Sequence, residues 1–275
     1  MLHTPPPRLH RDGTEEGIRV SVAFLSDIGS VRKNNEDALV VADLAKAERT
    51  FANGEMINCL VGDRGLLLCV ADGMGGAKAG EVAAQMTVER LPSVLTQDSN
   101  QASTIDRLRQ ALKSVNYDIA CAAQKDFERQ GMGAAVTAVL VNDRQAVIGQ
   151  VGDSRGYLIR AGEVHQLTKD QSIVQSMVDA GVLTPTEAAS SPYRNVILQA
   201  LGAAEDVEPA VVEVELEVDD QLVLCTDGLS NKISPEEIRD TLSQPGTLYD
   251  SCLSMVDLAK QRGGEDNITV IVAQF

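Results

Sequence analysis

Residues 66–76 read LLLCVADGMGG: an apolar run that ends in an aspartate and is followed by three glycines and a methionine. A short, continuous run of apolar residues such as 66–71 is typical of a strand buried in a sheet. The glycines indicate that another part of the backbone approaches closely just after the strand. Asp72 is therefore predicted at the end of a buried strand, where a sheet opens onto its loops.

The same arrangement recurs along the chain. Further apolar runs, each predicted to be a buried strand, cover residues 146–151, 221–226 and 268–273. An aspartate lies at or beside an end of each run: Asp153, Asp227 and Asp266, while the acidic pair Glu36-Asp37 precedes another apolar stretch. Loops at a sheet rim bring distant carboxylates together, and hard cations such as Mg²⁺ or Mn²⁺ prefer oxygen ligands. Two cations can share a bridging carboxylate, and Gly73 would let its own carbonyl approach one of them.

Each of these residues also has a simpler interpretation. Asp-Gly is a common turn signal, so Asp72 and Asp227 taken singly are explained as well by capped turns. Residues 152–155 (GDSR) look like a tight turn that Asp153 could stabilise through its own backbone. Arg32 could hold two phosphate oxygens beside a metal pair, or could be a surface arginine. The joint occurrence of the aspartates with Arg32 favours a functional site.

The remaining patterns indicate the fold class. Residues 211–218 (VVEVELEV) alternate with period two, which predicts a half-exposed strand with its glutamates outward. Helices are predicted over residues 79–95, 104–129 and 247–261, and a further one after the N-cap Ser234 and Pro235. Many strands follow each other without an intervening helix, so antiparallel sheets with helices packed on them fit better than a βαβ fold. We expect a flexible tail over residues 1–17 and a single domain over 18–275.

Charge and composition exclude several classes of function. The chain has 40 acidic and 24 basic residues and a net charge of −16, which argues against binding nucleic acid or an anionic membrane. Five scattered cysteines without a C-x-x-C pair point to a reducing compartment. No run is long enough to span a membrane, and residues 1–13 lack the apolar core of a signal peptide. We expect a cytoplasmic protein.

Taken in order, the motifs resemble a known family. The series SD-x-G-x-VR-x-NNED, VADGMGG, VGDSRGY, LT-x-D, CTDGLS and GGEDNIT is similar to that of the protein phosphatase 2C type, in its short bacterial form. The resemblance runs from about residue 20 to 275. It implies an α+β fold with a central antiparallel β-sandwich and helices on both outer faces. It also implies hydrolysis of phosphoserine and phosphothreonine in proteins by a metal-activated water at a binuclear Mg²⁺ or Mn²⁺ centre.

The resemblance assigns one side of that centre to the first motifs. Asp72 would bridge both cations. Gly73 would offer its carbonyl to one of them, and Glu36 and Asp37 would lie on the same side, as ligands directly or through water.

The other side follows from the later motifs. Asp227 and Asp266 would hold the second cation, with Asn267 bracing Asp266. Asp153 would serve a weaker third cation, and Arg32 would bind the substrate phosphate. Of all these residues, Arg32, Asp72 and Asp227 are the ones expected to be catalytic. The implied partners are phosphoprotein substrates and a cognate serine/threonine kinase, and we expect a monomer.

One position departs from the family pattern. Animal members carry a histidine after the Asp-Gly, proposed as a general acid, and here that position is Met74. We therefore assign no side chain as general acid. Residues 170–192 correspond to a mobile flap beside the site, and read as a short helix followed by a loop of small residues.

Two other functions remain open from the sequence. Residues 72–76 could imitate the D-x-G-x-G loop of an ATP-binding module, although Asp153, Asp227 and Asp266 would then be unexplained. The chain could also be an inactive relative that works by binding, although Arg32 and the metal aspartates are all present.

Overall fold

The computed structural model describes residues 18–46, 48–50, 54–75, 79–97 and 103–275. The predicted N-terminal tail, residues 1–17, lies outside these ranges, as does Gly76 of the first motif. Among the described helices, none combines the length and hydropathy that crossing a bilayer requires.

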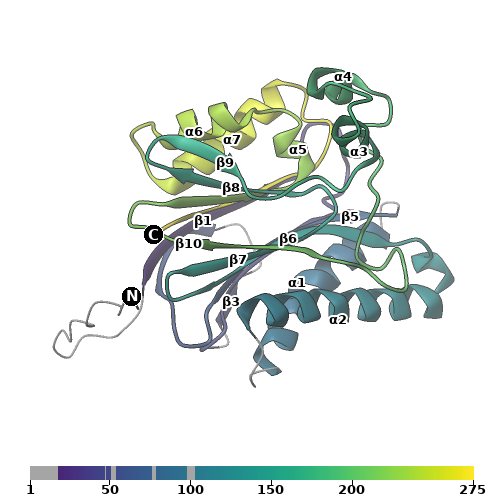
Figure 1. The fold of residues 1–275 in the computed structure, drawn as a ribbon, viewed down its shortest axis with the longest axis horizontal. Helices are drawn as coiled ribbons and strands as arrows, with labels where there is room; N and C mark the ends of the chain where they lie inside the picture. Colours follow the sequence, from purple (N-terminus) through teal and green to yellow (C-terminus); the bar gives the residue numbers. More distant parts are fainter. Residues whose placement is uncertain (1–17, 47, 51–53, 76–78, 98–102) are drawn as a thin grey trace, which may run out of the picture.

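Within the described residues, the strands form two six-stranded sheets in which every pair is antiparallel. The first sheet has the order β4 (Gly54–Leu60), β1 (Arg19–Asp27), β12 (Ile268–Gln274), β11 (Gln221–Cys225), β8 (Arg155–Arg160) and β9 (Glu163–Gln166). The second has the order β10 (Ala210–Glu215), β7 (Gln145–Val151), β6 (Gly133–Asn142), β5 (Leu66–Met74), β2 (Asp37–Asp43) and β3 (Glu48–Thr50). The two sheets stack face to face (Figure 1).

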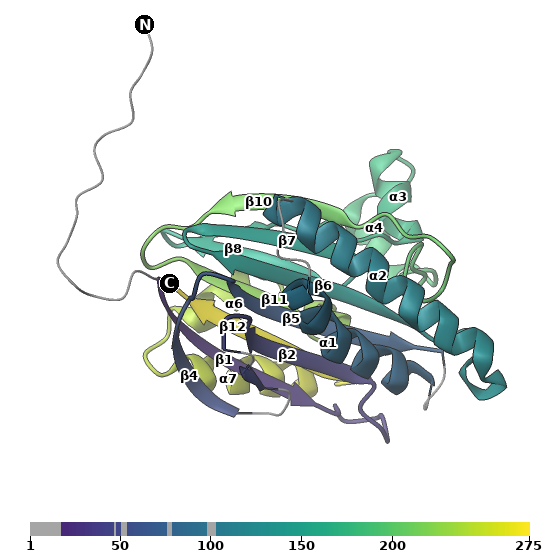
Figure 2. The same cartoon turned by 90° about the horizontal axis from the view of Figure 1, so that it is seen from below.

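Helices cover both outer faces of this sandwich. Helices α1 (Ala79–Gln97) and α2 (Thr104–Lys125) pack on the second sheet, and Figure 2 shows them lying across it. Helices α6 (Pro235–Leu242) and α7 (Leu248–Gln261) pack on the first sheet. The short elements are η1 (Phe127–Arg129), α3 (Ile173–Asp179), α4 (Pro185–Ser190) and α5 (Asp227–Ser230). The predicted central antiparallel sandwich with helices on both outer faces is confirmed.

Strand β5 shows why the chain builds four layers. Because side chains alternate along a strand, its apolar run supplies two faces at once. Leu67, Cys69 and Ala71 join the core shared with α1 and α2. Leu66, Leu68 and Val70 join the core between the sheets. A run that is apolar on both faces must be covered on both, which places β5 inside the sandwich.

The expected boundaries hold to within two residues, with three exceptions. Strand β5 continues through Asp72 and Gly73 to Met74 instead of ending at residue 71. The helix expected over 104–129 ends at Lys125, and the strand expected over 211–218 ends at Glu215 with its glutamates exposed. The expected small-residue loop of the flap contains a second helix, α4, whose N-cap Thr184 forms a capping box with Glu187.

Candidate metal centre

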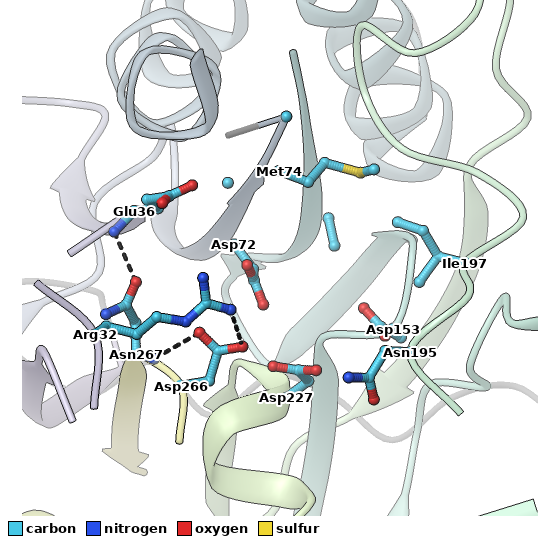
Figure 3. A pocket seen from close by; sticks show the side chains of 13 residues that line it. Arg32, Glu36, Asp72, Met74, Asp153, Asn195, Ile197, Asp227, Asp266 and Asn267 are labelled. Atoms are coloured by element: carbon cyan, nitrogen blue, oxygen red, sulfur yellow. Dashed lines mark hydrogen bonds and ion pairs between the residues drawn. The ribbon is translucent and has the colours of Figure 1, made fainter. Parts of the chain in front are cut away.

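The predicted site residues come from separate segments that meet at one end of the sandwich. They surround a cavity of about 390 Å³, and Figure 3 shows their side chains pointing into it from several directions. Its lining contains these predicted residues: Arg32, Glu36, Asp72, Gly73, Asp153, Asp227, Asp266 and Asn267. The structure therefore brings together every predicted site residue except Asp37.

Asp72 lies within strand β5, directly between Asp37 of β2 and Ala135 of β6 in the sheet register. It is therefore not in a capped turn. Residues 72–74 are also not a loop that follows a helix, as the alternative of an ATP-binding module requires.

Gly73 is required by packing in this structure. A Cβ there would lie 2.2 Å from the carbonyl oxygen of Gly80 and 2.6 Å from that of Glu36. The amide of Gly73 also donates to the carbonyl of Glu36 at 3.1 Å. This close approach holds Glu36, which precedes β2, against the end of β5.

Asp37 lies behind the cavity. Its Oδ2 accepts hydrogen bonds from the hydroxyls of Thr226 at 2.8 Å and Thr269 at 2.7 Å. Burial raises the pKa of Asp37 to about 7, although these two hydroxyls favour its ionised form. In this structure Asp37 joins β2 to the ends of β11 and β12.

Asp266 and Asn267 form one wall of the cavity. Arg32 Nη2 lies 2.8 Å from Asp266 Oδ2, with side-chain exposures of 48% and 36%, and the Asn267 amide donates to Asp266 Oδ1 at 2.8 Å. The side chain of Asn267 accepts from the Glu36 amide at 2.8 Å and donates to the carbonyls of Ile28 and Asn34, each at 2.9 Å. Asn267 thus fixes the loop of Arg32 and Glu36 relative to Asp266.

The adjoining wall carries Asp227 and Asp153, with Asp227 beside Asp266 (Figure 3). Asp227 is the first residue of α5, and Asn231 Nδ2 donates to its Oδ2 at 3.1 Å. Asp153 lies between β7 and β8, which belong to different sheets. Residues 152–154 therefore cross from one sheet to the other, so the short turn expected at 152–155 connects the two sheets. Gly152 has a φ of 101°, and a Cβ there would lie 2.5 Å from the Cβ of Ala135.

The carboxylates of the cavity are crowded. Burial and neighbouring carboxylates, chiefly Asp37 and Asp227, raise the pKa of Asp72 well above its ordinary range. Burial, and then the charge of Asp227, raises the pKa of Asp153 to about 7. Burial, and then the charge of Asp266, raises the pKa of Asp227. The site therefore carries more negative charge than Arg32 alone can balance.

Oxygen ligands around such a cavity suit a hard divalent cation, because Mg²⁺ and Mn²⁺ prefer carboxylates and the described part of the lining contains no cysteine or histidine. Among the residues the structure describes, no group of three or more acidic, cysteine or histidine side chains lies close enough together to hold a metal ion as it stands. Asp266 is paired with Arg32 instead. The donor set thus fits cations whose binding would draw the carboxylates together.

The sequence interpretation missed four residues of the lining, Gly75, Ala135, Asn195 and Ile197, and considered Met74 only as a substitution for histidine. Asn195 and Ile197 belong to the segment that returns from the flap, and Ile197 forms an isolated β-bridge with Ser172. No motif marks this segment, because only the tertiary path of the chain returns it to the rim.

Comparison with known proteins agrees with this arrangement. A family model described as Protein phosphatase 2C matches residues 57–261. The chain is 38% identical over 251 residues to the serine/threonine protein phosphatase PstP of Mycobacterium tuberculosis, covering 91% of this chain and 44% of PstP. It is 37% identical over 260 residues to the protein phosphatase PhpP of Streptococcus pneumoniae, covering 93% of this chain and 98% of PhpP.

A solved structure gives the same likeness in three dimensions. The catalytic domain of PstP in complex with two manganese ions matches with a TM-score of 0.76 and 35% identity, over 94% of this chain and 99% of that one. This chain therefore spans less than half of full-length PstP, but nearly all of its catalytic domain and of PhpP.

Proposed function

The chain belongs to the protein phosphatase 2C family, and from this premise we propose that it hydrolyses phosphoserine and phosphothreonine in proteins. Membership confirms the resemblance noted in the sequence. The observation that carries the proposal is the cavity at the rim of the sandwich. Five carboxylates and one guanidinium, from segments far apart in the sequence, converge on a single space large enough for a phosphoryl group.

The proposed cofactors are two Mg²⁺ or Mn²⁺ ions, which when bound would stabilise charge on the phosphoryl oxygens and activate the attacking water. Asp72 would contact both, since its carboxylate lies between Glu36 on one side and Asp227 with Asp266 on the other (Figure 3). Glu36 and the carbonyl of Gly73 would hold one ion. Asp227 and Asp266 would hold the other.

Two further residues belong to the proposed coordination. Asp153, next to Asp227 on the same wall, would hold a weaker third ion. Asp37 supports this set from behind, through Thr226 and Thr269.

Arg32 would bind and orient the phosphoryl group. Its contact with Asp266 uses Nη2, and the planar guanidinium has further N–H donors suited to two phosphate oxygens. Asp266 in turn sets the direction of the guanidinium.

No histidine lines the cavity within the described residues, and Met74 occupies the position after Asp72-Gly73. The proton for the leaving serine or threonine oxygen would therefore come from a water in the cavity.

The domain bounds, the oligomeric state, the location in the cell and the opposing kinase are also proposals. Residues 18–275 would work as one catalytic domain, as a monomer in the cytoplasm, and would reverse the action of a serine/threonine kinase. Support for this comes from the acidic composition and from relatives named as serine/threonine protein phosphatases.

A phosphate-release assay on phosphothreonine peptides tests the proposed function. We expect turnover that requires Mn²⁺ or Mg²⁺, disappears in EDTA and is lost in Asp227→Asn, which keeps the shape of the side chain but removes its charge. The folded chain, supplied with Mn²⁺, could instead release no phosphate from any phosphopeptide or aryl phosphate. That result would favour the alternative of an inactive relative that works by binding.

A further inference from the structure

The crossover that carries Asp153 is held by side-chain and backbone hydrogen bonds from other segments and not by strand pairing. The amide of Gly152 donates to Gln171 Oε1 at 2.8 Å, and the carbonyl of Gly152 accepts from the amide of Gln171 at 2.9 Å. Gln171 therefore closes a ring of two hydrogen bonds around the residue that precedes Asp153. It lies 19 residues away, at the point where the chain enters the flap.

A second group fixes the crossover from behind. Gln150, whose exposure is 1%, donates through Nε2 to the carbonyls of Gly152 at 3.3 Å and Ser154 at 3.1 Å. Thr137 Oγ1 donates to the same Ser154 carbonyl at 2.6 Å. Hydrogen bonds thus hold both neighbours of Asp153, so the direction of its carboxylate depends on them.

Gln171 also contacts the opposite side of the flap. The backbone carbonyl of Gln171 accepts a hydrogen bond from the amide of Leu198 at 2.7 Å. The next residue, Ser172, forms an isolated β-bridge with Ile197. Ile197 and Asn195 line the catalytic cavity. Gln171 therefore joins the loop of Asp153 to the flap segment that lines the cavity.

We infer that Gln171 is a positioning residue: its side-chain carbonyl holds the Asp153 loop in the geometry that phosphopeptide hydrolysis requires, and its backbone joins that loop to the Asn195–Ile197 segment. This inference rests on the proposed phosphatase function. A purely structural role would instead lower the stability of the flap and leave the kinetics of the folded enzyme unchanged.

The test replaces the acceptor while keeping the size of the side chain. In Gln171→Met the Gly152 amide loses its partner, and we expect kcat on a phosphothreonine peptide to fall about tenfold with little change in KM. Gln175→Met is the matched control, since Gln175 lies one helical turn further into the flap and donates to Asp179. Gln171→Asn, which keeps the amide but shortens its reach, is a milder variant should Gln171→Met fold poorly.

Two measurements separate positioning from stability. In an Asp153→Asn background, Gln171→Met should cause almost no further loss, because both changes act through one carboxylate. Hydrogen exchange should also speed up in residues 150–156 of Gln171→Met, with or without metal, because the Gly152 amide loses its acceptor. It should stay unchanged in residues 196–198, since the Leu198 amide donates to the backbone carbonyl of Gln171, and in both segments of Gln175→Met. Faster exchange throughout residues 172–198 of Gln171→Met would instead indicate a role in flap stability.

Equal kcat in Gln171→Met and wild type would overturn the inference alone. So would fully additive losses with Asp153→Asn, or an Asp153→Asn enzyme with normal turnover. A folded wild-type chain without any metal-dependent phosphatase activity would instead overturn the proposed function, and this inference with it.

Discussion

At the residue scale, the charge balance of the cavity depends on Arg32. Within the described lining it is the only basic side chain, facing Glu36, Asp72, Asp153, Asp227 and Asp266. Its ion pair with Asp266 is well exposed, and such pairs contribute at most about 1 kcal/mol to stability. This ion pair therefore contributes little to the stability of the fold.

Arg32→Ala should weaken catalysis without unfolding the protein. Loss of a charged, two-donor contact to the phosphoryl group should lower kcat/KM and raise KM. The expected loss of transition-state stabilisation is about 2–4 kcal/mol. Arg32→Lys should recover only part of this loss, because an ammonium group cannot make the bidentate contact. Steady-state kinetics on one phosphopeptide, alongside melting curves, measures both effects. Unchanged kinetics in Arg32→Ala would make it an ordinary surface arginine.

At the scale of elements, two helices begin with the same local signal. Ser234-Pro235-Glu236-Glu237 and Thr184-Pro185-Thr186-Glu187 both form an N-cap, a proline at the first helical position and a capping box. The sequence interpretation used the first signal and read the second as a loop, which was wrong. The small residues after Pro185 are typical of a loop, but the capping box of Thr184 and Glu187 starts a helix there.

Removing the first cap should affect the stability of the whole domain, and removing the second should affect only the flap. Ser234→Ala should lower the free energy of unfolding by about 1 kcal/mol, because α6 packs on the first sheet and melts with it. Thr184→Ala should speed hydrogen exchange in residues 184–191 and leave the global melting temperature almost unchanged, because α4 is mostly exposed. An equal drop in melting temperature for both variants would show that the flap unfolds together with the core.

At the scale of the whole molecule, the apolar pattern and the motif order predicted most of the fold and the rim of carboxylates. Runs such as 66–71 must be covered on both faces, which specifies a layered sandwich. Asn195 and Ile197 could not be predicted, because their place depends on how the flap returns to β6. The position of Asp37 behind the cavity was equally hidden, since it depends on hydrogen bonds from Thr226 and Thr269, which lie far away in the sequence.

The crowded carboxylates predict an unusual pH dependence of stability. Burial raises the pKa of Asp37 and Asp153 to about 7 and that of Asp72 and Asp227 above normal. Between about pH 4 and 7 the folded state therefore binds more protons than the unfolded state, so stability falls as pH rises. For Asp37, a rise from 3.8 to about 7 corresponds to at most ~4 kcal/mol.

Melting temperatures of metal-stripped protein in EDTA should thus be lower at pH 8 than at pH 5. Mn²⁺ should stabilise more at pH 8, because cations favour the ionised carboxylates. Asp37→Asn keeps an acceptor for Thr226 and Thr269 and should flatten the pH dependence. Stability that rises from pH 5 to 8 without metal would contradict the assigned directions of these pKa shifts.

The central claim is that this rim of carboxylates is a two-cation centre for phosphate hydrolysis. Calorimetric titration of metal-stripped protein with Mn²⁺, paired with phosphopeptide turnover at each point, tests it most directly. We expect two ions to bind per chain and activity to appear as they bind. Asp72→Asn should weaken both sites, and Asp227→Asn should weaken one. Full turnover by the metal-stripped wild type, or unaltered Mn²⁺ binding in Asp72→Asn, would contradict it.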